Sequence, residues 1–305
     1  MASVKRIKVK NKEYWILIHS VRKGNKIIQK KKYIGKILPP KKRLEQVKKE
    51  FLREIFDGKH YMFFSKKDVE EIEWRKTQYK KELKKLGETE KNDKLKEFII
   101  RYTYDSSKLA GVDVTLRQTF LILREGIIPK DFKTLRVAKE LENHEKGFIA
   151  ITKYKGKFSL KFIKKLHKIL FSGIDEDIAG KLRNELKRDI KIAGTTYIPP
   201  KWRDLEKELS NFFRWYKAEN RKLHPLELAS LIHLKIVSIQ PFIDGNSRLS
   251  RLLMNWVLWK KGYPLINIPI EDLENYYDVL DKYQIEKQEK PFIEYIKIKY
   301  MNENA

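Results

Sequence analysis

The stretch Gln240–Arg251, QPFIDGNSRLSR, constrains the fold of this chain more than any other. Its centre, Asp244-Gly245-Asn246, is typical of a tight turn, because glycine tolerates a positive φ and Asx side chains bond the nearby backbone. The residues that follow place apolar side chains on one face of a helix that ends at Gly262. The sequence therefore predicts a tight loop that leads directly into a largely buried helix.

The start of this helix favours an anion. A helix N-terminus has free N–H groups and the positive end of the macrodipole, so it attracts phosphate. Arg248 and Arg251 are spaced i, i+3 and can hold the same anion from one face. Asp244 offers an oxygen ligand to a hard cation that bridges phosphates. The alternatives are a helix N-cap for Asp244 and Asn246, and salt-bridged or solvent-facing arginines.

The same stretch resembles the signature of the Fic (Fido) family, HxFx(D/E)GN(G/A)(R/K)xxR, whose members mostly transfer AMP from ATP to a protein hydroxyl. Seven positions are in register: Pro241, Phe242, Asp244, Gly245, Asn246, Arg248 and Arg251. The resemblance covers about residues 97–285 and implies an all-α Fic domain with a short β-hairpin flap. It also implies ATP as the nucleotide and a target protein that docks on the flap.

The resemblance assigns roles within the signature. Asp244 would bind Mg²⁺, and Asn246 with the backbone N–H groups of residues 245–248 would form an anion hole that includes Gly245 and Ser247. Arg248 would hold the β-phosphate region of ATP, and Arg251 would reach the γ-phosphate.

Two positions depart from the family pattern. Gln240 stands where the family has its catalytic histidine, and Ser247 stands where it has a small glycine. A glutamine amide can orient a hydroxyl but cannot take its proton, and general base catalysis contributes roughly 10²–10⁴ in rate. We therefore expect a weak or inactive transferase, a pseudoenzyme, unless Gln240 is an engineered change. His233 lies about 10 Å upstream along the helix, so we expect it to have a structural role. We expect Ser247 to impair phosphate binding mildly.

Two upstream segments extend the resemblance. Residues 188–200, with Gly194, Thr195, Thr196 and Tyr197, resemble the family's flap, which pairs with the target's backbone by strand addition. Residues 105–112 resemble its inhibitory helix, (S/T)xxxE(G/N): Ser106, Ser107 and Gly111 are present, but Ala110 replaces the glutamate. We therefore expect Arg251 to lack the restraint that this glutamate provides. The alternative is a serine pair at an ordinary helix start.

Composition limits the other classes of function. The absence of cysteine excludes disulfides, thiolate nucleophiles and Cys-based zinc sites. No segment has the apolar run of a signal peptide or membrane span, so we expect a cytoplasmic protein. The net charge is +27, and residues 1–50 contain 17 Lys or Arg against three acids. This basic N-terminus favours a polyanionic partner, nucleic acid or an acidic protein surface, and the alternative is a solubilising face.

The chain divides into three expected parts. Residues 1–40 form a basic β-hairpin module, with strands at 13–21 and 26–34 around a turn at Gly24-Asn25. Residues 41–96 form a charged helical connector, with helices at 41–57 and 66–86, and residues 97–301 form the Fic domain. Helical patterns within that domain occupy 115–125, 131–145, 158–172, 202–221, 225–238, 247–261, 272–285 and 291–301.

Two functions remain open at this point. The first is a Fic-fold nucleotide-binding protein related to adenylyltransferases, weak or inactive because of Gln240. The alternative is a non-catalytic nucleic-acid-binding adaptor that acts through the basic N-terminal 50 residues. The sequence identifies neither the target protein, nor the transferred group, nor the oligomeric state.

Overall fold

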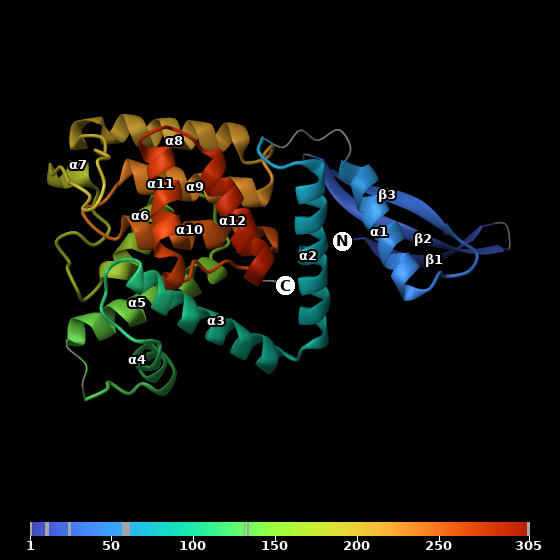
Figure 1. The fold of residues 1–305 in the computed structure, drawn as a ribbon, viewed down its shortest axis with the longest axis horizontal. Coiled ribbons are helices and arrows are strands. Elements are labelled where there is room, and N and C mark those ends of the chain that lie inside the picture. Colours follow the sequence, from blue (N-terminus) through green and yellow to red (C-terminus); the bar gives the residue numbers. More distant parts are fainter. Residues whose placement is uncertain are drawn as a thin grey trace. The chain divides into compact units, whose positions relative to one another are not determined.

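The computed structural model describes residues 2–9, 12–23, 26–56, 62–130, 132 and 134–303. The chain forms two compact units, Met1–Glu82 (unit 1) and Leu83–Ala305 (unit 2). The prediction of a mostly helical protein with a small N-terminal sheet is confirmed, as Figure 1 shows. No helix among the described residues is long and apolar enough to cross a bilayer.

Unit 1 contains a small antiparallel sheet and helices. The sheet has the strand order β1-β2-β3, so the predicted hairpin (β2–β3) has a third strand, β1, that the sequence reading missed. The predicted Gly24-Asn25 turn lies outside the described residues. The elements are β1 (Ser3–Val9), β2 (Lys12–Lys23), β3 (Lys26–Gly35), α1 (Lys41–Phe56) and α2 (Lys66–Lys85), whose last turn reaches unit 2.

Unit 2 is built around the antiparallel pair α9 (Pro225–Ile239) and α10 (Asn246–Lys261), which pack more extensively on each other than any other pair of its helices. α10 also packs on α5, and α9 packs on α8 and α12 (Figure 1). The other helices are α3 (Glu88–Lys108), α4 (Leu116–Phe120), α5 (Leu135–Lys153), α6 (Leu160–Phe171), α7 (Arg183–Leu186), α8 (Leu205–Glu219), α11 (Leu273–Gln284) and α12 (Lys290–Glu303). Three single-turn elements complete the unit: a π-helix at Leu121–Glu125 and 3₁₀ turns at Trp202–Asp204 and Ile270–Asp272.

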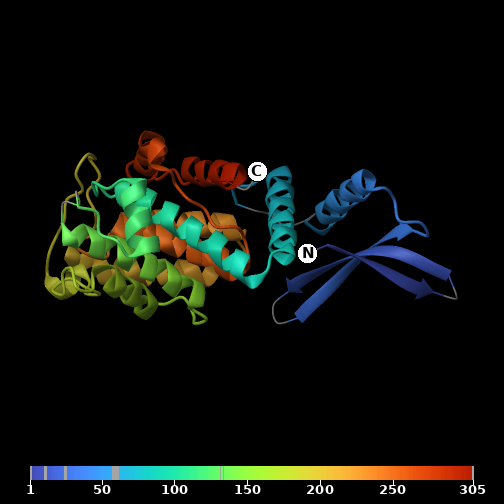
Figure 2. The same cartoon turned by 90° about the horizontal axis from the view of Figure 1, so that it is seen from below.

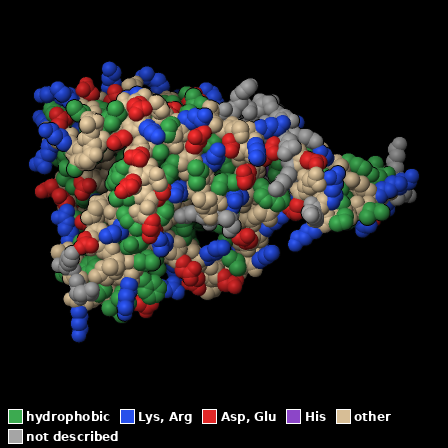
Figure 3. All heavy atoms as spheres, viewed as in Figure 1, with side chains coloured by type: hydrophobic (Ala, Val, Ile, Leu, Met, Phe, Trp, Pro, Cys, Tyr) green, Lys and Arg blue, Asp and Glu red, His purple; other side chains and the backbone are tan. Residues whose placement is uncertain are grey.

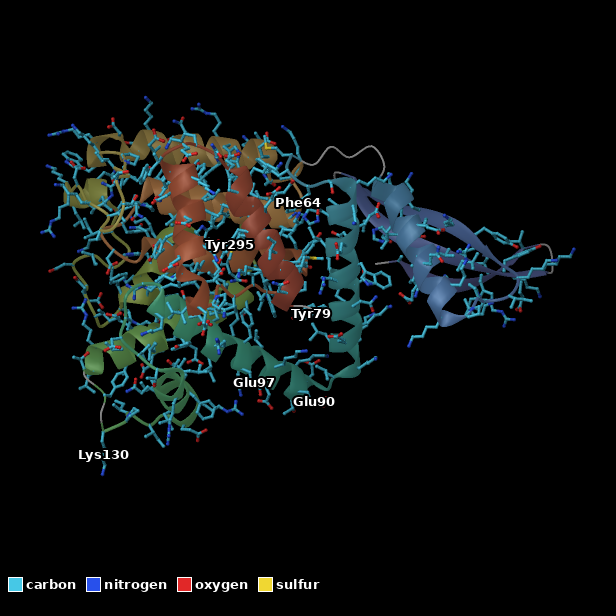
Figure 4. All side chains as sticks on the ribbon, viewed as in Figure 1. Phe64, Tyr79, Glu90, Glu97, Lys130 and Tyr295 are labelled. Carbon is cyan, nitrogen blue, oxygen red and sulfur yellow. The ribbon has the colours of Figure 1, made fainter. Side chains whose placement is uncertain are left out.

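The long helix α3 was not predicted as one element. Glu90 and Glu97 both lie on it (Figure 4), so position 97 is inside a helix. The domain limits at residues 40 and 96 stay a prediction. The charged first half of α3 hides the helical periodicity. At the start of α3, the Glu90 carboxylate accepts a hydrogen bond from the Gly87 N–H at 2.7 Å and caps the helix.

The core of unit 2 is aromatic at one end of α10. Trp256 stacks on Phe158 at 5.1 Å, and Phe158 contacts Phe212 and Tyr216 of α8. These aromatic side chains pack on one another, which explains the apolar stripe of α8 as core. The opposite end of α10 is its N-terminus, where the loop from α9 enters.

Candidate functional site

The loop between α9 and α10, residues 240–245 (the signature loop), has an unusual backbone at both ends. Gln240 ends α9 in the left-handed region (φ 51°, ψ 62°), and Gly245 precedes α10 with φ 76°. A Cβ on Gly245 would lie 2.5 Å from the Phe171 ring, so only glycine fits there. A non-glycine residue with positive φ costs about 1–3 kcal/mol and persists only where its surroundings hold it.

Arg183 of α7 holds the Gln240 end of the loop. Its side chain is completely buried and donates to the carbonyl of Gln240 from Nε at 2.6 Å, and to those of Ile239 and Pro200 from Nη2 at 3.3 and 2.9 Å. Its backbone N–H donates to the Pro241 carbonyl at 3.0 Å. Sequence reasoning missed Arg183, because nothing in the local pattern indicates which carbonyls a buried arginine will meet.

His167 of α6 holds the other end. The Gly180 N–H donates to its Nδ1 at 2.9 Å, so the proton of the neutral ring is on Nε2, which donates to the Asp244 carbonyl at 3.0 Å. The ring stacks on Phe242 at 3.7 Å. Burial lowers the pKa of His167 to about 4, and the nearby Arg248 charge acts in the same direction. The imidazole is therefore neutral at pH 7 and orients the loop.

Asn246 also serves the loop itself. Its Oδ1 accepts from the Phe242 N–H at 3.0 Å and its Nδ2 donates to the Phe242 carbonyl at 2.8 Å. The side chain is thus committed to the turn. The sequence alternative of a helix N-cap is wrong, because Gly245 is the N-cap residue of α10 and Asn246 bonds the loop before it. Any anion contact at this position would come from the backbone N–H groups that open α10.

Arg248 lies at the mouth of the loop between two carboxylates. Nη1 donates to Glu140 of α5 at 3.2 Å, and Nη2 lies 3.5 Å from Asp244. Its guanidinium also stacks on the Phe171 ring at 5.3 Å, and its Nε has no partner among the described residues. The Asp244 carboxylate is 61% exposed. The exposed Asp244 carboxylate can therefore turn toward a ligand, whereas Arg248 is buried and held in place.

Arg251 is buried and held by hydrogen bonds from three of its nitrogens. Its exposed fraction is 1%, and it donates to Ser106 Oγ at 2.8 Å and to the Ser106 carbonyl at 2.6 Å. A third donor, Nη1, reaches the Tyr276 hydroxyl at 3.3 Å. The glutamate restraint is absent, as expected, because position 110 is alanine, but Arg251 is held by another contact, Ser106 of the inhibitory-helix-like segment.

The inhibitory-helix-like segment is the last turn of α3, so Ser106 and Ser107 end a helix rather than begin one. The buried Asp105 carboxylate fastens this turn by accepting from Asn267 Nδ2 at 2.5 Å and the Ile270 N–H at 3.1 Å. Ala110 and Gly111 follow as an exposed turn. The serine alternative of an ordinary helix start is therefore not what the structure has.

His233 is a buried side chain that packs behind the pocket and does not line it. Its Nε2 is 3.0 Å from the Tyr276 hydroxyl, and burial lowers its pKa well below the usual value, with Arg251 adding to the effect. This agrees with the structural role expected for His233.

The flap segment, residues 189–200, differs from the predicted hairpin. It is an extended loop with a turn at Ala193-Gly194, and none of its residues is assigned to a strand. Thr195 Oγ1 donates to Asp281 of α11 at 2.8 Å, and the Tyr197 hydroxyl donates to the Ser238 carbonyl at 2.9 Å. Burial raises the pKa of Tyr197 to about 12. Thr196 lies beside these anchors, on the half-exposed part of the loop.

These segments enclose one pocket of about 440 Å³, a size typical of small-molecule sites. It is lined by the end of α3, the flap segment, the signature loop and α11: Leu109, Ala110, Gly111, Ile190, Lys191, Ile192, Ala193, Gln240, Ile243, Asp244, Gly245, Asn246, Ser247, Arg248 and Tyr277. Gly194, Thr195, Thr196 and Tyr197 do not line it, nor do Ser106, Ser107 and Arg251. The described residues contain no cluster of three or more His, Asp or Glu side chains that could hold a metal ion.

Gln240 lies in this pocket, and the nitrogen of its side-chain amide is already hydrogen-bonded. Nε2 donates to the Val237 carbonyl at 2.7 Å. The amide oxygen is left to accept a hydrogen bond from a bound hydroxyl.

Comparisons with known proteins agree with this geometry. A model of the Fic/DOC family matches residues 157–258. The chain is 35% identical over 205 residues to the protein adenylyltransferase Fic of Drosophila erecta and 34% identical to that of Drosophila melanogaster, in each case over 66% of this chain. The matched part is 40% of each relative, so the chain spans well under half their length.

Solved structures show the same fold. A Fic domain containing signaling protein from Bacteroides thetaiotaomicron superposes with a TM-score of 0.68 at 25% identity, over 78% of this chain and 94% of that one. Fic-1 from C. elegans superposes with a TM-score of 0.66 at 21% identity, over 87% of this chain and 76% of that one.

Proposed function

Because this chain belongs to the Fic family, we propose that unit 2 binds ATP and is related in function to the protein adenylyltransferases, with AMP transfer limited by Gln240. The observation that carries the proposal is the pocket itself. It brings the α10 N-terminus, Asp244 and Arg248 together with the position where the family has its base. Positive charge and free N–H groups favour the phosphates of a nucleotide at that place.

The residues present fit a magnesium ion that arrives with the nucleotide. Mg²⁺ is commonly held by one or two carboxylates together with substrate phosphates, and the exposed Asp244 carboxylate borders the pocket. Bound there, the ion would neutralise phosphate charge. Glu140 would hold Arg248 in place until phosphate oxygens replace part of its contact.

In AMP transfer a target hydroxyl attacks the α-phosphorus and pyrophosphate leaves, so one proton must leave the hydroxyl. Gln240 can accept a hydrogen bond from that hydroxyl through its amide oxygen, but it cannot take the proton. Without general base catalysis, the rate of transfer falls roughly 10²–10⁴-fold. His167 does not replace it, because its Nδ1 and Nε2 both serve backbone groups.

The flap segment supports the second half of the proposal, a protein target. Among the described residues, no backbone–backbone hydrogen bond involves residues 190–198. The Tyr197 N–H donates to Thr195 Oγ1 at 3.2 Å. The other N–H and C=O groups of this extended backbone suit strand addition by an extended segment of a partner. The target hydroxyl would then lie next to Gln240.

For Arg251 to take part in ATP binding, its present hydrogen bonds must break. To reach a γ-phosphate it must leave Ser106, and each charge-assisted hydrogen bond it gives up is worth about 1.5–3 kcal/mol. Ser106→Ala removes the Oγ acceptor and keeps the carbonyl. We expect this variant to bind ATP several-fold more tightly.

The test incubates the full chain with Mg²⁺ and α-labelled ATP, alone and with a lysate, beside Gln240→His and Arg248→Ala. Thermal unfolding is followed in parallel, with the exposed α8 residue Arg214→Ala as a matched loss of one arginine. We expect ATP to stabilise the unmodified chain and Arg214→Ala, by about 2.7 kcal/mol at a hundred times Kd, and not to stabilise Arg248→Ala. We expect strong labelling only with Gln240→His.

Two other outcomes would contradict parts of the proposal. Labelling by the unmodified chain that Arg248→Ala abolishes would show that transfer proceeds without a histidine at position 240. No stabilisation of any variant by ATP would overturn nucleotide binding, and with it the proposed function.

A further inference from the structure

The three strands of unit 1 carry an excess of positive charge that the pocket in unit 2 does not explain. Together they hold ten Lys and Arg residues and one acid, Glu13. The pairing register places Lys5 and Tyr33 opposite Ile16, and Lys31 opposite Ile18. Because side chains alternate between the faces of a sheet, these residues share one face.

We name this side the open face. Its residues with described side chains are Ser3, Lys5, Ile7, Val9, Lys12, Tyr14, Ile16, Ile18, Ser20, Ile27, Gln29, Lys31 and Tyr33. None of them is acidic. Glu13 lies on the other face, where it pairs with Arg6.

Burial shows which face the rest of unit 1 covers. On the other face, Leu17 is fully buried and His19 is 8% exposed, and α1 supplies the buried Phe51 and Leu52. Figure 2 shows α1 on one side of the sheet and, in the described part of unit 1, no helix on the other side. On the open face only Ile16 is buried, while Lys5, Gln29 and Lys31 are exposed and Tyr33 is 58% exposed.

Figure 3 views unit 1 from the side that α1 covers, and Lys, Arg and apolar side chains gather at the strand end on that side as well. The ring of Tyr33 contacts that of Tyr14 at 5.4 Å, so the open face combines lysines with an aromatic pair. An uncovered sheet face with positive charge and no carboxylate suits a polyanion.

The dimensions of the sheet select the class of polyanion. Neighbouring strands are about 4.8 Å apart, so β1 and β3 are about 10 Å apart. The major groove of B-form DNA is about 12 Å wide, whereas its minor groove is about 6 Å wide. The major groove of A-form RNA is too deep and narrow for side chains to read. We propose that the open face docks in the major groove of double-stranded DNA.

In this arrangement the two outer strands lie next to the two phosphate backbones. Lys5 on β1 and Lys31 on β3 contact phosphates on opposite sides of the groove, which sets the position of the sheet. Gln29 and the Tyr33 hydroxyl face the base edges, where amide and hydroxyl groups form hydrogen bonds. Lys8 and Lys30 are exposed on the same two strands but on the other face, and contact no phosphate.

The test measures binding of the full chain to a fluorescent 20-base-pair DNA duplex between 50 and 300 mM salt. Lys5→Gln with Lys31→Gln is compared with Lys8→Gln with Lys30→Gln, which removes the same charge from the same strands on the other face. Each phosphate contact contributes about 0.9 to the slope of log affinity against log salt. We expect the first pair to reduce that slope by about two and to weaken binding roughly tenfold or more, and the second pair to bind within about twofold of the unmodified chain.

The probes distinguish the groove from general attraction. We expect duplex RNA and single-stranded DNA of the same length to bind more weakly than duplex DNA, and heparin to compete. Equal affinity for all three nucleic acids, or equal losses for the two lysine pairs, would overturn docking through the open face. Thermal unfolding of both variants checks that the sheet is intact, and because the pocket residues are unchanged, the result is independent of nucleotide binding.

Discussion

The signature loop and the flap segment border the same pocket, but unit 2 holds them very differently. The backbone of the signature loop is fastened at both ends by buried side chains, Arg183 at Gln240 and His167 at Asp244. The flap segment is fastened by Thr195 and Tyr197 beyond its turn, and Ile198 beside them is 83% exposed.

The difference suits the two tasks that we propose for these regions. A site for phosphate needs N–H groups and charges that are already in place, because reorganisation at the moment of binding or reaction weakens their effect. A surface that pairs with the backbone of another protein needs free hydrogen-bonding groups and room to adjust. The first task uses buried, long-range contacts and the second leaves the backbone uncovered.

The largest expected difference between the two regions is in the stability lost when one of two glycines with nearly the same φ is replaced by alanine. Gly245 in the loop has φ 76° and Gly194 in the flap has φ 79°. Alanine at either position incurs strain of about 1–2 kcal/mol from the positive φ, but at Gly245 its Cβ would also lie 2.5 Å from Phe171, whereas at Gly194 nothing lies within 4 Å.

Overpacking adds about 1–3 kcal/mol. We therefore expect Gly245→Ala to destabilise the chain by about 2–5 kcal/mol in urea unfolding and to abolish ATP-dependent stabilisation. Gly194→Ala should cost about 1–2 kcal/mol and leave ATP binding unchanged. Similar losses for both variants would contradict the contrast between the regions.

The next effect concerns Arg183, which connects the two regions. Arg183→Met keeps much of the side-chain volume but leaves the carbonyls of Ile239, Gln240 and Pro200 without their donor. Each buried polar group left unsatisfied costs about 1–3 kcal/mol. We expect a loss of roughly 3 kcal/mol or more in urea unfolding, together with weaker ATP binding.

Lys164→Met is the matched control for Arg183→Met, because Lys164 forms only a part-exposed ion pair with Glu185. Exposed pairs are worth about 0–1 kcal/mol. An equal loss in the two methionine variants would show that Arg183 does not hold the loop.

A pH dependence follows from His167. Its folded-state pKa of about 4 is below the usual value of 6.5, so between these values the unfolded chain binds more protons than the folded one. Stability contributed by the neutral ring is present above pH 6.5 and is lost as the pH falls toward 4, with a slope of up to about 1.4 kcal/mol per pH unit. His144 and His233, whose pKa values burial also lowers, add slopes of the same sign.

The measurement is the free energy of unfolding between pH 7 and pH 4.5. His167→Gln should be less stable at pH 7 and should show a smaller slope than the unmodified chain. An unchanged slope would mean that the His167 ring takes up its proton without disturbing the loop.

The smallest change in stability is expected for a substitution in the flap segment. Thr195→Ala removes one hydrogen bond, to Asp281, from a half-exposed anchor. A typical hydrogen bond contributes about 0.5–1.5 kcal/mol net and one to a charged group about 1.5–3 kcal/mol, and because solvent reaches this half-exposed anchor we expect about 1.5 kcal/mol or less in thermal unfolding. If a target protein is found, its affinity should change more than stability does, because the anchor sets the position of the segment. Thr196→Ala is the control.

The sequence was informative wherever a local rule was sufficient. Turn chemistry and helical periodicity placed the loop at residues 240–245 and the helix after it, and α8, α9, α11 and α12 begin and end within a few residues of their predicted limits. Local patterns failed at α3, whose charged first half has little apolar periodicity, and at β1, which is largely exposed and is a strand because it pairs with β2.

Within the site, the resemblance to the Fic family predicted which segments converge on the pocket, since Asp244, Arg248, Gln240, Ala110 and residues 190–193 of the flap segment line it. The partners of those residues could not be predicted in the same way. Glu140 is 108 positions from Arg248, and Ser106 is 145 positions from Arg251.

The amino-acid sequence was therefore sufficient for the turn, the helix that follows it and the excess charge of the first 50 residues. These are properties of neighbouring residues, and short-range sterics, periodicity and composition express them directly. The packing of distant helices was needed to show that Ser106 holds Arg251, that Arg183 and His167 hold the loop, and that the flap is uncovered. A buried donor takes whichever acceptor the folded chain brings within about 3 Å, and that acceptor is specified by the fold and not by the donor's neighbours in sequence.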